Sequence, residues 1–360
     1  MRVVEVVRGL GIGGIEVSLA RRLRYRPADA WTAVISTQPK LDSLSDEVRA
    51  HSDALIDLET KRWDYRALVA QIRQLQPEVV VSHIPLETMK VLMSALPNEV
   101  PVVVVAHHPK SSERPWAEGL ISASLRRVNH KAALHMAVST AAAEGSQCSG
   151  ARRVEVLPLG AALSDAAPDH SLWPADCRVR LLSLGRLRAF KNLDNLLRGV
   201  SLASSTMRHH KAFLAIVGDG SERDRLAAII AQQGLSDLVR MHPATSDPSG
   251  ILRATDVFFT VSTSEGGPIT AIEALLAGSR LATTRTGLYS DLAAGHPHVT
   301  PIDDPHPEAI ASSLERAALE GAVTAHERAG NSESAARWNS EASSMNFYAA
   351  LRAIADAEQF

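Results

Sequence analysis

The sequence predicts an α/β protein with two domains, each built on a parallel sheet that helices cover on both faces. Two observations support this fold class. Short runs of Val, Ile and Leu alternate with longer segments of helical periodicity rich in Ala, Leu and Arg, and this alternation stops once near the middle of the chain and then resumes. A length of 360 residues is also enough to give each of two domains its own core.

The first half of the chain carries the strand and helix patterns of one such domain. Its strand segments are short and almost wholly apolar, which is typical of strands buried on both faces. We expect strands at residues 3–7, 33–35, 79–81, 102–106, 136–138 and 154–157, and helices at 16–23, 65–75 and 120–133.

A break in the pattern separates the two halves. Residues 164–176 contain two prolines and little apolar periodicity, which is typical of a linker. Beyond it we expect strands at 180–184, 212–217, 239–241, 257–261 and 281–283, helices near 193–203, 222–233 and 269–277, and a last helix at 344–357. The predicted organisation is a Rossmann-like domain at 1–165, a linker at 166–177 and a second Rossmann-like domain at 178–343. Open α/β sheets bind ligands at the carboxyl ends of their strands, so two such domains facing each other would enclose one cleft, suited to joining two large polar substrates.

Composition excludes several classes of protein. The formal net charge is −2, so no global positive field favours nucleic acid as a partner. Cys148 and Cys177 form no CxxC pair, which excludes a disulfide scaffold and predicts a reducing compartment. No signal-peptide pattern is present near the N-terminus and the longest apolar runs are far shorter than a membrane span, so we expect a cytoplasmic protein.

A glycine-rich segment follows the first predicted strand. Gly9-Leu-Gly11-Ile-Gly13-Gly14 satisfies the GxGxxG pattern of dinucleotide-binding domains. The second strand, however, runs into Ser36-Thr37-Gln38, without the acidic residue that would hold a ribose. Two other interpretations are a tight turn in which backbone approaches backbone, and a loop whose bare amides lie near an anionic ligand at the start of the helix that contains Glu16.

Cations follow the first strand of the second half. Gly185, Arg186, Arg188 and Lys191 lie between this strand and the next helix. A glycine permits close approach, Arg offers a bidentate fork for phosphate oxygens and Lys adds a compact charge, so the segment is a candidate diphosphate site. The alternative is a set of solvated surface cations.

A second candidate segment ends a strand and opens a helix. Pro268 suits the first helical turn, and Gly266 and Gly267 would leave helix N-terminal amides open to an anion. Glu265 precedes this helix, and Glu273 lies inside it on an otherwise apolar face, where a carboxylate is costly unless it is paired. Two carboxylates on either side of a phosphate-sized site are suited to holding a nucleotide sugar from both ends.

Several motifs in order resemble the donor domain of family 4 glycosyltransferases, which have the GT-B fold. The motifs are residues 182–187 with 191–192, 216–220, 254–257 and 264–278, the last with the Glu-x7-Glu pair. Residues 13–16 are similar to the acceptor-side loop of that family, 154–160 to its strand before the linker, and 338–348 to the tail that crosses back onto the first domain. By this resemblance the first domain binds the acceptor and includes the helix at about 344–360.

The resemblance implies retaining transfer of a hexose-type sugar from a nucleotide diphosphate donor to an acceptor hydroxyl, with UDP favoured and GDP as the alternative. Arg186 and Lys191 would neutralise the leaving diphosphate, Glu265 would contact the donor sugar and Glu273 the ribose. The predicted catalytic residues are Arg186, Lys191, Glu265 and His107. The predicted donor-binding residues are Gly13, Gly14, Gly185, Gly218, Gly266, Gly267, Pro268, Ile269, Thr270 and Glu273.

Histidines follow two strands of the first domain. His107 and His108 follow the strand at 102–106, where the family commonly has a histidine near the sugar; His107 fits this place best, His108 is the alternative, and a loop histidine without a role is also open. His83 follows the strand at 79–81 in the same way. The predicted acceptor-binding residues are Glu16, His83 and His108.

Two departures from the family pattern concern the sugar and its surroundings. The chain has Pro158-Leu159-Gly160 where the family often has Pro-Asn-Gly, and it lacks the aromatic residue that often follows Glu-Gly. The chain also contains no Asp-x-Asp pair of the kind metal-dependent glycosyltransferases use, so we expect neither a metal nor another cofactor.

The sequence is compatible with two kinds of acceptor. The basic residues of two predicted helices in the first domain are Arg21, Arg22, Arg24, Arg26, Arg126, Arg127 and Lys131. They are suited to peripheral contact with an anionic membrane and a lipid-linked glycan acceptor, or simply to complementing helix dipoles in an enzyme with a small-molecule acceptor. Other functions left open are a phosphorylase or sugar-phosphate synthase on the same fold, a non-catalytic nucleotide-sugar-binding protein and an NAD(P)-dependent oxidoreductase.

Overall fold

The protein consists of two compact units. The computed structural model describes residues 1–11, 14–38, 43–58, 65–83, 92–93, 96, 100–107, 126, 129–267 and 269–357. Unit 1 comprises Met1–Gly160 and Ser340–Phe360, and unit 2 comprises Ala161–Asn339.

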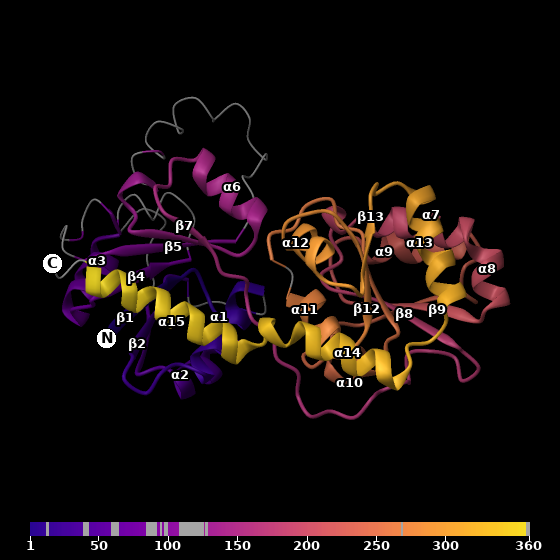
Figure 1. Ribbon diagram of the computed structural model, residues 1–360, viewed down its shortest axis with the longest axis horizontal. Coiled ribbons are helices and arrows are strands. Elements are labelled where there is room, and N and C mark those ends of the chain that lie inside the picture. The colour runs from indigo at the N-terminus through magenta and orange to yellow at the C-terminus, as the bar shows by residue number, and fades with distance from the viewer. Residues whose placement is uncertain are drawn as a thin grey trace. The chain divides into compact units, whose positions relative to one another are not determined.

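Unit 1 is built on a parallel sheet. Its strands are β1 (Arg2–Val7), β2 (Trp31–Ser36), β3 (Ala54–Asp57), β4 (Val79–Ser82), β5 (Val102–Ala106), β6 (Leu134–Ala137) and β7 (Val154–Val156), in the order β3-β2-β1-β4-β5-β6-β7. The helices described for this unit are α1 (Gly14–Arg24), α2 (Ser45–His51), α3 (Arg66–Leu75), α6 (Thr140–Cys148) and α15 (Ser340–Ala357) (Figure 1). The central strands are buried on both faces and mostly apolar, as is typical of a parallel sheet.

Unit 2 repeats the plan. Its strands are β8 (Val179–Leu184), β9 (Ala212–Val217), β10 (Val239–His242), β11 (Val257–Thr260), β12 (Arg280–Thr284) and β13 (Val299–Ile302), in the order β10-β9-β8-β11-β12-β13, all parallel. Its helices are α7 (Leu193–Leu202), α8 (Ser204–His209), α9 (Arg223–Gln232), α10 (Ser249–Ala254), α11 (Ile269–Leu276), α12 (Leu288–Gly295), α13 (Pro307–Glu320) and α14 (Ala325–Ala335), with short 3₁₀ turns η2 (Ala189–Lys191) and η3 (Ala336–Trp338).

The strand orders confirm the predicted fold class. Each sheet runs outward in one direction from its first strand and then restarts on that strand's other side. The order therefore reverses between β1 and β4 in unit 1 and between β8 and β11 in unit 2. Such a switch point leaves a crevice at the carboxyl ends of the two strands, where open α/β sheets bind ligands.

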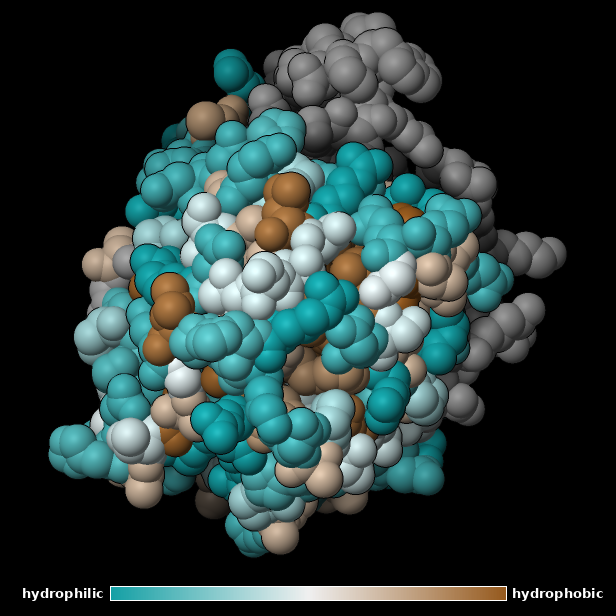
Figure 2. Space-filling model, turned by 90° about the vertical axis from the view of Figure 1, so that its right-hand side faces the viewer, coloured by the Kyte–Doolittle hydropathy of each residue, from teal (hydrophilic) through white to brown (hydrophobic). Residues whose placement is uncertain are grey.

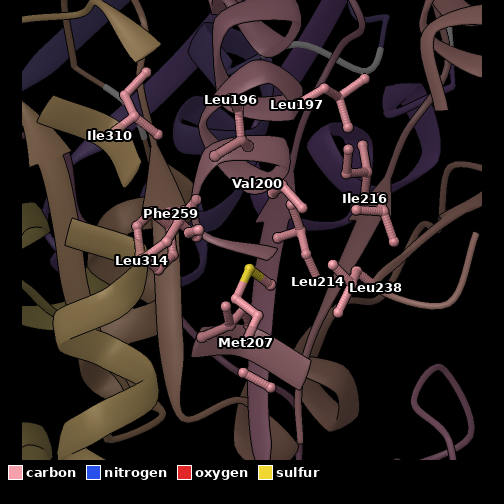
Figure 3. Packing of buried hydrophobic residues seen from close by; sticks show 14 of the residues in the cluster. Leu196, Leu197, Val200, Met207, Leu214, Ile216, Leu238, Phe259, Ile310 and Leu314 are labelled. Atoms are coloured by element: carbon pink, nitrogen blue, oxygen red, sulfur yellow. The ribbon is translucent and has the colours of Figure 1, made fainter. Parts of the chain in front are cut away.

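The core of unit 2 lies between its sheet and the helices α7 and α13. Figure 3 shows Leu196 and Val200 of α7, Leu214 of β9 and Leu314 of α13 meeting in this core. The helices α7 and α13 lie side by side (Figure 1).

On the face shown in Figure 2, apolar side chains occur in small, separated groups among polar ones, as on an ordinary solvated surface.

The segment expected to be a linker packs on unit 2. The indole of Trp173 is buried and its Nε1 donates to the carbonyl of Leu181, 3.1 Å away. Arg253 Nε donates to the carbonyl of Ala166 at 3.0 Å, and the amide of Asp169 donates to the carbonyl of Gly250 at 2.9 Å. Residues 166–177 therefore belong to unit 2. The prolines and polar residues of this segment give no sign of that attachment in the sequence.

The C-terminal helix α15 packs in unit 1. Ser344 Oγ donates to the carbonyl of Arg22 at 3.0 Å, and the hydroxyls of Tyr348 and Thr32 lie 3.2 Å apart. The guanidinium carbon of Arg22 lies 3.7 Å from the centre of the Phe347 ring, a cation–π contact. The helix begins at Ser340, four residues before the start expected from the sequence.

A buried carboxylate joins three parts of unit 2. Asp256, fully buried just before β11, accepts hydrogen bonds from Nε of Arg180 at 2.9 Å and from the amide of Val323 at 3.1 Å. Arg328 Nη2 of α14 lies 3.5 Å from the same carboxylate. The predicted motif at 254–257 therefore links β8 to the segment before α14 and to α14 itself, at the opposite end of the sheet from the switch-point crevice.

We expect Asp256→Asn to lower the free energy of unfolding by about 3–5 kcal/mol, because it leaves two partly buried arginines without their counter-charge. Urea unfolding followed by circular dichroism measures this. The matched control is Asp237→Asn, which breaks an exposed pair with Arg208 and should change stability little. Equal losses in the two variants would contradict the role of Asp256.

The burial of two histidines predicts that the folded protein loses stability in acid. Burial lowers the pKa of His135 in β6 and of His296 after α12 from 6.5 to about 4. Between these values the unfolded chain binds more protons than the folded one, so stability is lost as pH falls from 6.5 to 4, by up to about 3 kcal/mol per histidine. Urea midpoints at pH 7 and pH 5 test this; an unchanged midpoint would contradict it.

Candidate active site

The switch-point crevice of unit 2 gathers the loops that follow β8, β9, β11 and β12. These loops, together with α11, contain most of the residues predicted to bind a donor. The sheet order makes β8 and β11 neighbours, although more than seventy residues separate them in the chain. Residues of the two strongest sequence motifs therefore meet at one edge of the sheet.

The loop after β8 directs a lysine back over its own glycine. Gly185 has φ +149°, and a Cβ added to it would lie 3.6 Å from Cε and Nζ of Lys191. The turn η2 closes through a hydrogen bond from the amide of Lys191 to the carbonyl of Arg188, 2.9 Å long. Asn192, with φ +57°, then starts α7, and its side-chain amide donates to the carbonyl of Pro305 at 2.9 Å. These contacts fix the base of the lysine side chain.

Lys191 forms an ion pair with Glu265 from the loop after β11. The ammonium group contacts Oε1 of Glu265, and Ser262 Oγ donates to the same oxygen at 3.3 Å. The two loops are also joined through the backbone, because the amide of Thr263 donates to the carbonyl of Phe190 at 2.8 Å. The side chains of Lys191 and Glu265 are 17% and 13% exposed, so the pair is largely shielded yet reachable from solvent. This is the contact that brings the two predicted motifs together.

The backbone at Glu265 rests on a glycine from the loop after β12. Gly287 has φ +52°, and a Cβ on it would lie 2.0 Å from the carbonyl oxygen of Glu265. The amide of Leu288 donates to the carbonyl of Gly266 at 3.1 Å. Beneath the loop, Thr260 donates to the hydroxyl of buried Tyr289 at 2.8 Å; burial and the negative charge of Glu265 raise the pKa of Tyr289 well above 10, so it stays neutral.

Gly218 packs against the loop after β8. It has φ +153°, and a Cβ on it would lie 1.9 Å from the carbonyl oxygen of Gly185. Gly220 makes the same kind of close approach, since a Cβ there would lie 2.3 Å from the carbonyl oxygen of Leu187. The amides of Gly185 and Leu187 donate to carbonyls of the β9 side at 3.0 and 2.8 Å. The loops after β8 and β9 are therefore packed backbone against backbone.

We expect Gly218→Ala to displace the loop that carries Lys191, and thus to weaken nucleoside diphosphate binding and lower stability by more than about 1 kcal/mol. Calorimetric titration with UDP and urea unfolding measure the two effects. Gly234→Ala is the control: Gly234 also has positive φ, +63°, but no atom lies within 4 Å of an added Cβ. Similar UDP affinities in both variants would show that the collision with Gly185 does not matter.

The other described residues predicted for unit 2 lie near the same edge of the sheet. Arg186 is exposed, and its guanidinium has no hydrogen bond or ion pair within the described ranges of the chain. Gly266 is buried, and Gly267 and Thr270 are half-buried. Ile269 is buried at the first position of α11, and Glu273 is 3% exposed one turn further on. Pro268 lies outside the described residues.

Unit 1 brings together two of its predicted histidines. His83 follows β4, His107 follows β5, and their Nδ1 and Nε2 atoms lie 3.2 Å apart. Gly14 is exposed at the first position of α1, and Glu16 is half-buried in the first turn of that helix. Gly13 and His108 lie outside the described residues.

The basic helix end at residues 21–26 is mostly paired. Arg22 is buried against Glu5, Arg24 lies 2.9 Å from Glu47, and Arg26 hydrogen-bonds to the carboxylate of Asp53 at 3.2 Å. Arg22 therefore does not belong to a surface patch. The sequence pattern of alternating arginines on a helix does not show that one of them turns inward to meet a carboxylate on β1.

Sequence reasoning missed three residues of these sites. Glu5 has a signal, because a charged residue interrupts an otherwise apolar central strand. Gly287 has a weaker one, a glycine just after a buried strand. Ser262 has none, because nothing in a Ser-Thr-Ser run shows which hydroxyl faces a carboxylate.

Two features are absent from the described residues. Across the described ranges, no cluster of three or more His, Cys, Asp or Glu side chains is arranged to hold a metal ion. No helix in the same part of the chain is long and apolar enough to cross a membrane.

Comparison with known proteins identifies what unit 2 resembles. Residues 175–338 match the family described as glycosyl transferases group 1. The O-antigen biosynthesis glycosyltransferase WclY of Escherichia coli is 26% identical over 96 residues, which are 26% of this chain and 27% of WclY. The chain thus matches about a quarter of the length of this curated relative. The prediction of a transferase enzyme is supported by both the family and the relative.

Solved structures share the fold over the whole chain. HepE of Anabaena, in complex with UDP-glucose, is 16% identical with a TM-score of 0.77 and covers 98% of this chain and 100% of its own. The sucrose-phosphate synthase of Thermosynechococcus elongatus is 16% identical with a TM-score of 0.75 and covers 99% of this chain and 100% of its own. At this identity the likeness shows the fold alone, and it confirms the GT-B architecture.

Proposed function

We propose that the protein is a retaining glycosyltransferase that moves a hexose from a nucleotide diphosphate sugar, with UDP favoured, to an acceptor hydroxyl. The observation that carries the proposal is the pairing of Lys191 with Glu265 at the switch point of unit 2, inside the segment that matches group 1 glycosyl transferases. UDP-glucose bound to HepE supports the choice of UDP over GDP.

Each residue has a role that its chemistry suits. Lys191 and exposed Arg186 would stabilise the negative charge that develops on the diphosphate as its bond to the anomeric carbon breaks. Glu265 would accept hydrogen bonds from hydroxyls of the donor sugar, and Glu273 from those of the ribose. The new bond forms between the anomeric carbon and the acceptor oxygen, and the acceptor proton passes to an oxygen of the leaving diphosphate, so no separate base is required.

A donor panel tests the proposal. Release of nucleoside diphosphate is measured with UDP- and GDP-hexoses, and calorimetry compares binding of UDP, GDP and NADH. Turnover of a nucleotide sugar, with the anomeric configuration of the donor kept in the product as seen by NMR, supports the proposal. Binding without turnover would indicate a nucleotide-sugar-binding protein, and tight NADH binding without nucleoside diphosphate binding an oxidoreductase.

Catalysis without a metal is part of the proposal. Turnover should be unchanged by EDTA, because charge stabilisation is assigned to Lys191, Arg186 and backbone amides. Loss of turnover on chelation, restored by a divalent cation, would contradict it.

The acceptor is the least defined partner. The name of WclY refers to O-antigen biosynthesis, which favours a glycan acceptor over a small aglycone. Peripheral contact with an anionic membrane stays a prediction, which sedimentation with vesicles containing phosphatidylglycerol tests.

A further inference from the structure

A buried serine hydroxyl contacts the carboxylate of Glu265 at the switch point of unit 2. Ser262 follows β11 and is fully buried, and its Oγ donates to Oε1 of Glu265 at 3.3 Å. The ammonium group of Lys191 contacts the same oxygen. Oε2 of Glu265 has no hydrogen bond to any residue that the structure describes, and the side chain remains partly exposed. The protein therefore holds one oxygen of this carboxylate and leaves the acceptor sites of the other open.

The position of Ser262 is itself set by neighbouring strands. Its carbonyl accepts a hydrogen bond from Oγ1 of Thr284, at the end of β12, over 2.6 Å. The hydroxyl of Thr260 lies 3.4 Å from Ser262 Oγ and donates to the hydroxyl of Tyr289 at 2.8 Å. Thr260 thus uses its proton on Tyr289, and Ser262 uses its own on Glu265. Both the backbone and the hydroxyl of Ser262 are engaged three residues before the carboxylate.

We propose that Ser262 is a positioning residue whose hydroxyl fixes the carboxylate of Glu265, so that Oε2 accepts a hydrogen bond from a hydroxyl of the donor sugar. The part of this inference that concerns the sugar rests on the proposed function. The hold of Ser262 on the carboxylate does not.

The pair with Lys191 does not by itself fix the direction of the carboxylate. A lysine ammonium is a compact charge at the end of a flexible stem, and its three protons can turn toward different acceptors. The proposed function also draws this ammonium toward the leaving diphosphate. A hydroxyl on a buried backbone segment gives a directional bond that stays the same whether or not a diphosphate is bound. Ser262 therefore supplies the part of the contact that is independent of the nucleotide.

Loss of this hydroxyl should affect orientation more than stability. In Ser262→Ala the carboxylate of Glu265 keeps its pair with Lys191 and its access to solvent, so no buried charge is left without a partner. Alanine differs from serine by one oxygen atom and fits the same space. A change in sugar recognition without a matching loss of stability therefore reports on the orientation of the carboxylate.

A pair of alanine variants tests the positioning role. With the best UDP-hexose from the panel, we expect Ser262→Ala to lower kcat/KM by roughly 10-fold and to leave the affinity for UDP within about 2-fold of wild type. The control is Ser279→Ala: Ser279 is also fully buried, and its Oγ donates to the carbonyls of Leu252 and Thr255 at 3.1 and 3.2 Å, at the opposite end of the sheet. This control should leave kcat/KM unchanged, with a melting temperature like that of Ser262→Ala.

A conservative variant should rescue the loss. Ser262→Thr keeps the hydroxyl, so its kcat/KM should fall by no more than about 3-fold. Equal values of kcat/KM in the two alanine variants, or a fall in UDP affinity that parallels the fall in kcat/KM, would overturn the positioning role. If circular dichroism shows that the threonine variant is unfolded, the two alanine variants still decide.

Crystal structures of variants show the hold directly, without a donor. In Lys191→Met we expect Oε1 of Glu265 to stay within hydrogen-bond distance of Ser262 Oγ. In Lys191→Met/Ser262→Ala we expect the carboxylate to occupy more than one rotamer. A carboxylate that leaves Ser262 in the single variant, or keeps one unchanged conformer in the double variant, would overturn the proposal.

The two kinds of experiment fail separately. If wild type transfers no sugar from any donor, the proposed function is wrong, and the crystal structures still decide whether Ser262 holds Glu265. If transfer occurs but Ser262→Ala is as active as Ser279→Ala, only the positioning role is lost.

Discussion

Lys191→Met is expected to lower turnover by roughly 100-fold or more, the largest effect of any single substitution in unit 2. Methionine keeps the length and much of the volume of lysine but cannot stabilise charge on a leaving diphosphate. The change also leaves the carboxylate of Glu265 with the weaker hydrogen bond from Ser262. Steady-state kinetics with a UDP-hexose, together with circular dichroism of the variant, measure the effect at constant fold.

The control is a lysine of the same unit at the surface. Lys211 pairs with Asp176, and both side chains are largely exposed, so Lys211→Met should leave kcat and KM unchanged. Lys191→Met with turnover near that of this control would remove Lys191 from the mechanism.

The second large effect is expected for Glu265→Gln. The substitution keeps the size of the side chain but removes the charge that Lys191 faces, so transfer should fall by roughly 100-fold. UDP binding should be retained or strengthened, because the ammonium group of Lys191 is no longer neutralised by a neighbouring carboxylate. Calorimetry with UDP and single-turnover kinetics separate the two quantities.

Glu273→Gln should show the opposite pattern. Glu273 lies 3% exposed within α11, and its assigned partner is the ribose of the nucleotide, so UDP affinity should fall more than the rate at saturating donor. Parallel effects in the two glutamine variants would contradict the division of roles between the carboxylates.

The double variant tests whether Lys191 and Glu265 act as one unit. Residues in direct contact lose activity non-additively, so Lys191→Met/Glu265→Gln should be far less impaired than the product of the single effects. Additive losses would mean that the two side chains act independently.

The parts of the fold that depend on apolar patterning were predictable. The central strands of both sheets are buried on both faces, and their continuous Val, Ile and Leu runs mark them in the sequence. Several of the described elements, α6, β13 and α13 among them, were not predicted, and two others show why. The strand β3 is short and half-buried, and α14 has the sequence AHERAGNSESA with only Asn331 and Ala335 buried, so neither shows a clear period.

The site was predictable where function depends on residue type in order along the chain. Gly185, Lys191 and Glu265 are of that kind, because glycine turns, a cation and a carboxylate each follow a buried strand. The contacts that link Glu5 to His83 and Gly287 to Glu265 could not be predicted, because they depend on which strands become neighbours and on which atoms meet across a sheet. A sequence pattern shows the periodicity of single helices and strands, whereas these contacts are set by the sheet topology.

The return of α15 to unit 1 has a consequence for biosynthesis. Unit 2 is one uninterrupted stretch, Ala161–Asn339, inserted within unit 1, and α15 follows it in the chain. The ribosome therefore finishes the inserted unit while its host still lacks a helix. Since domains fold as units during synthesis, nascent unit 2 should become protease-resistant first. Until Phe347 and Tyr348 emerge, Arg22 lacks its cation–π contact and the hydroxyl of Thr32 lacks the hydroxyl of Tyr348.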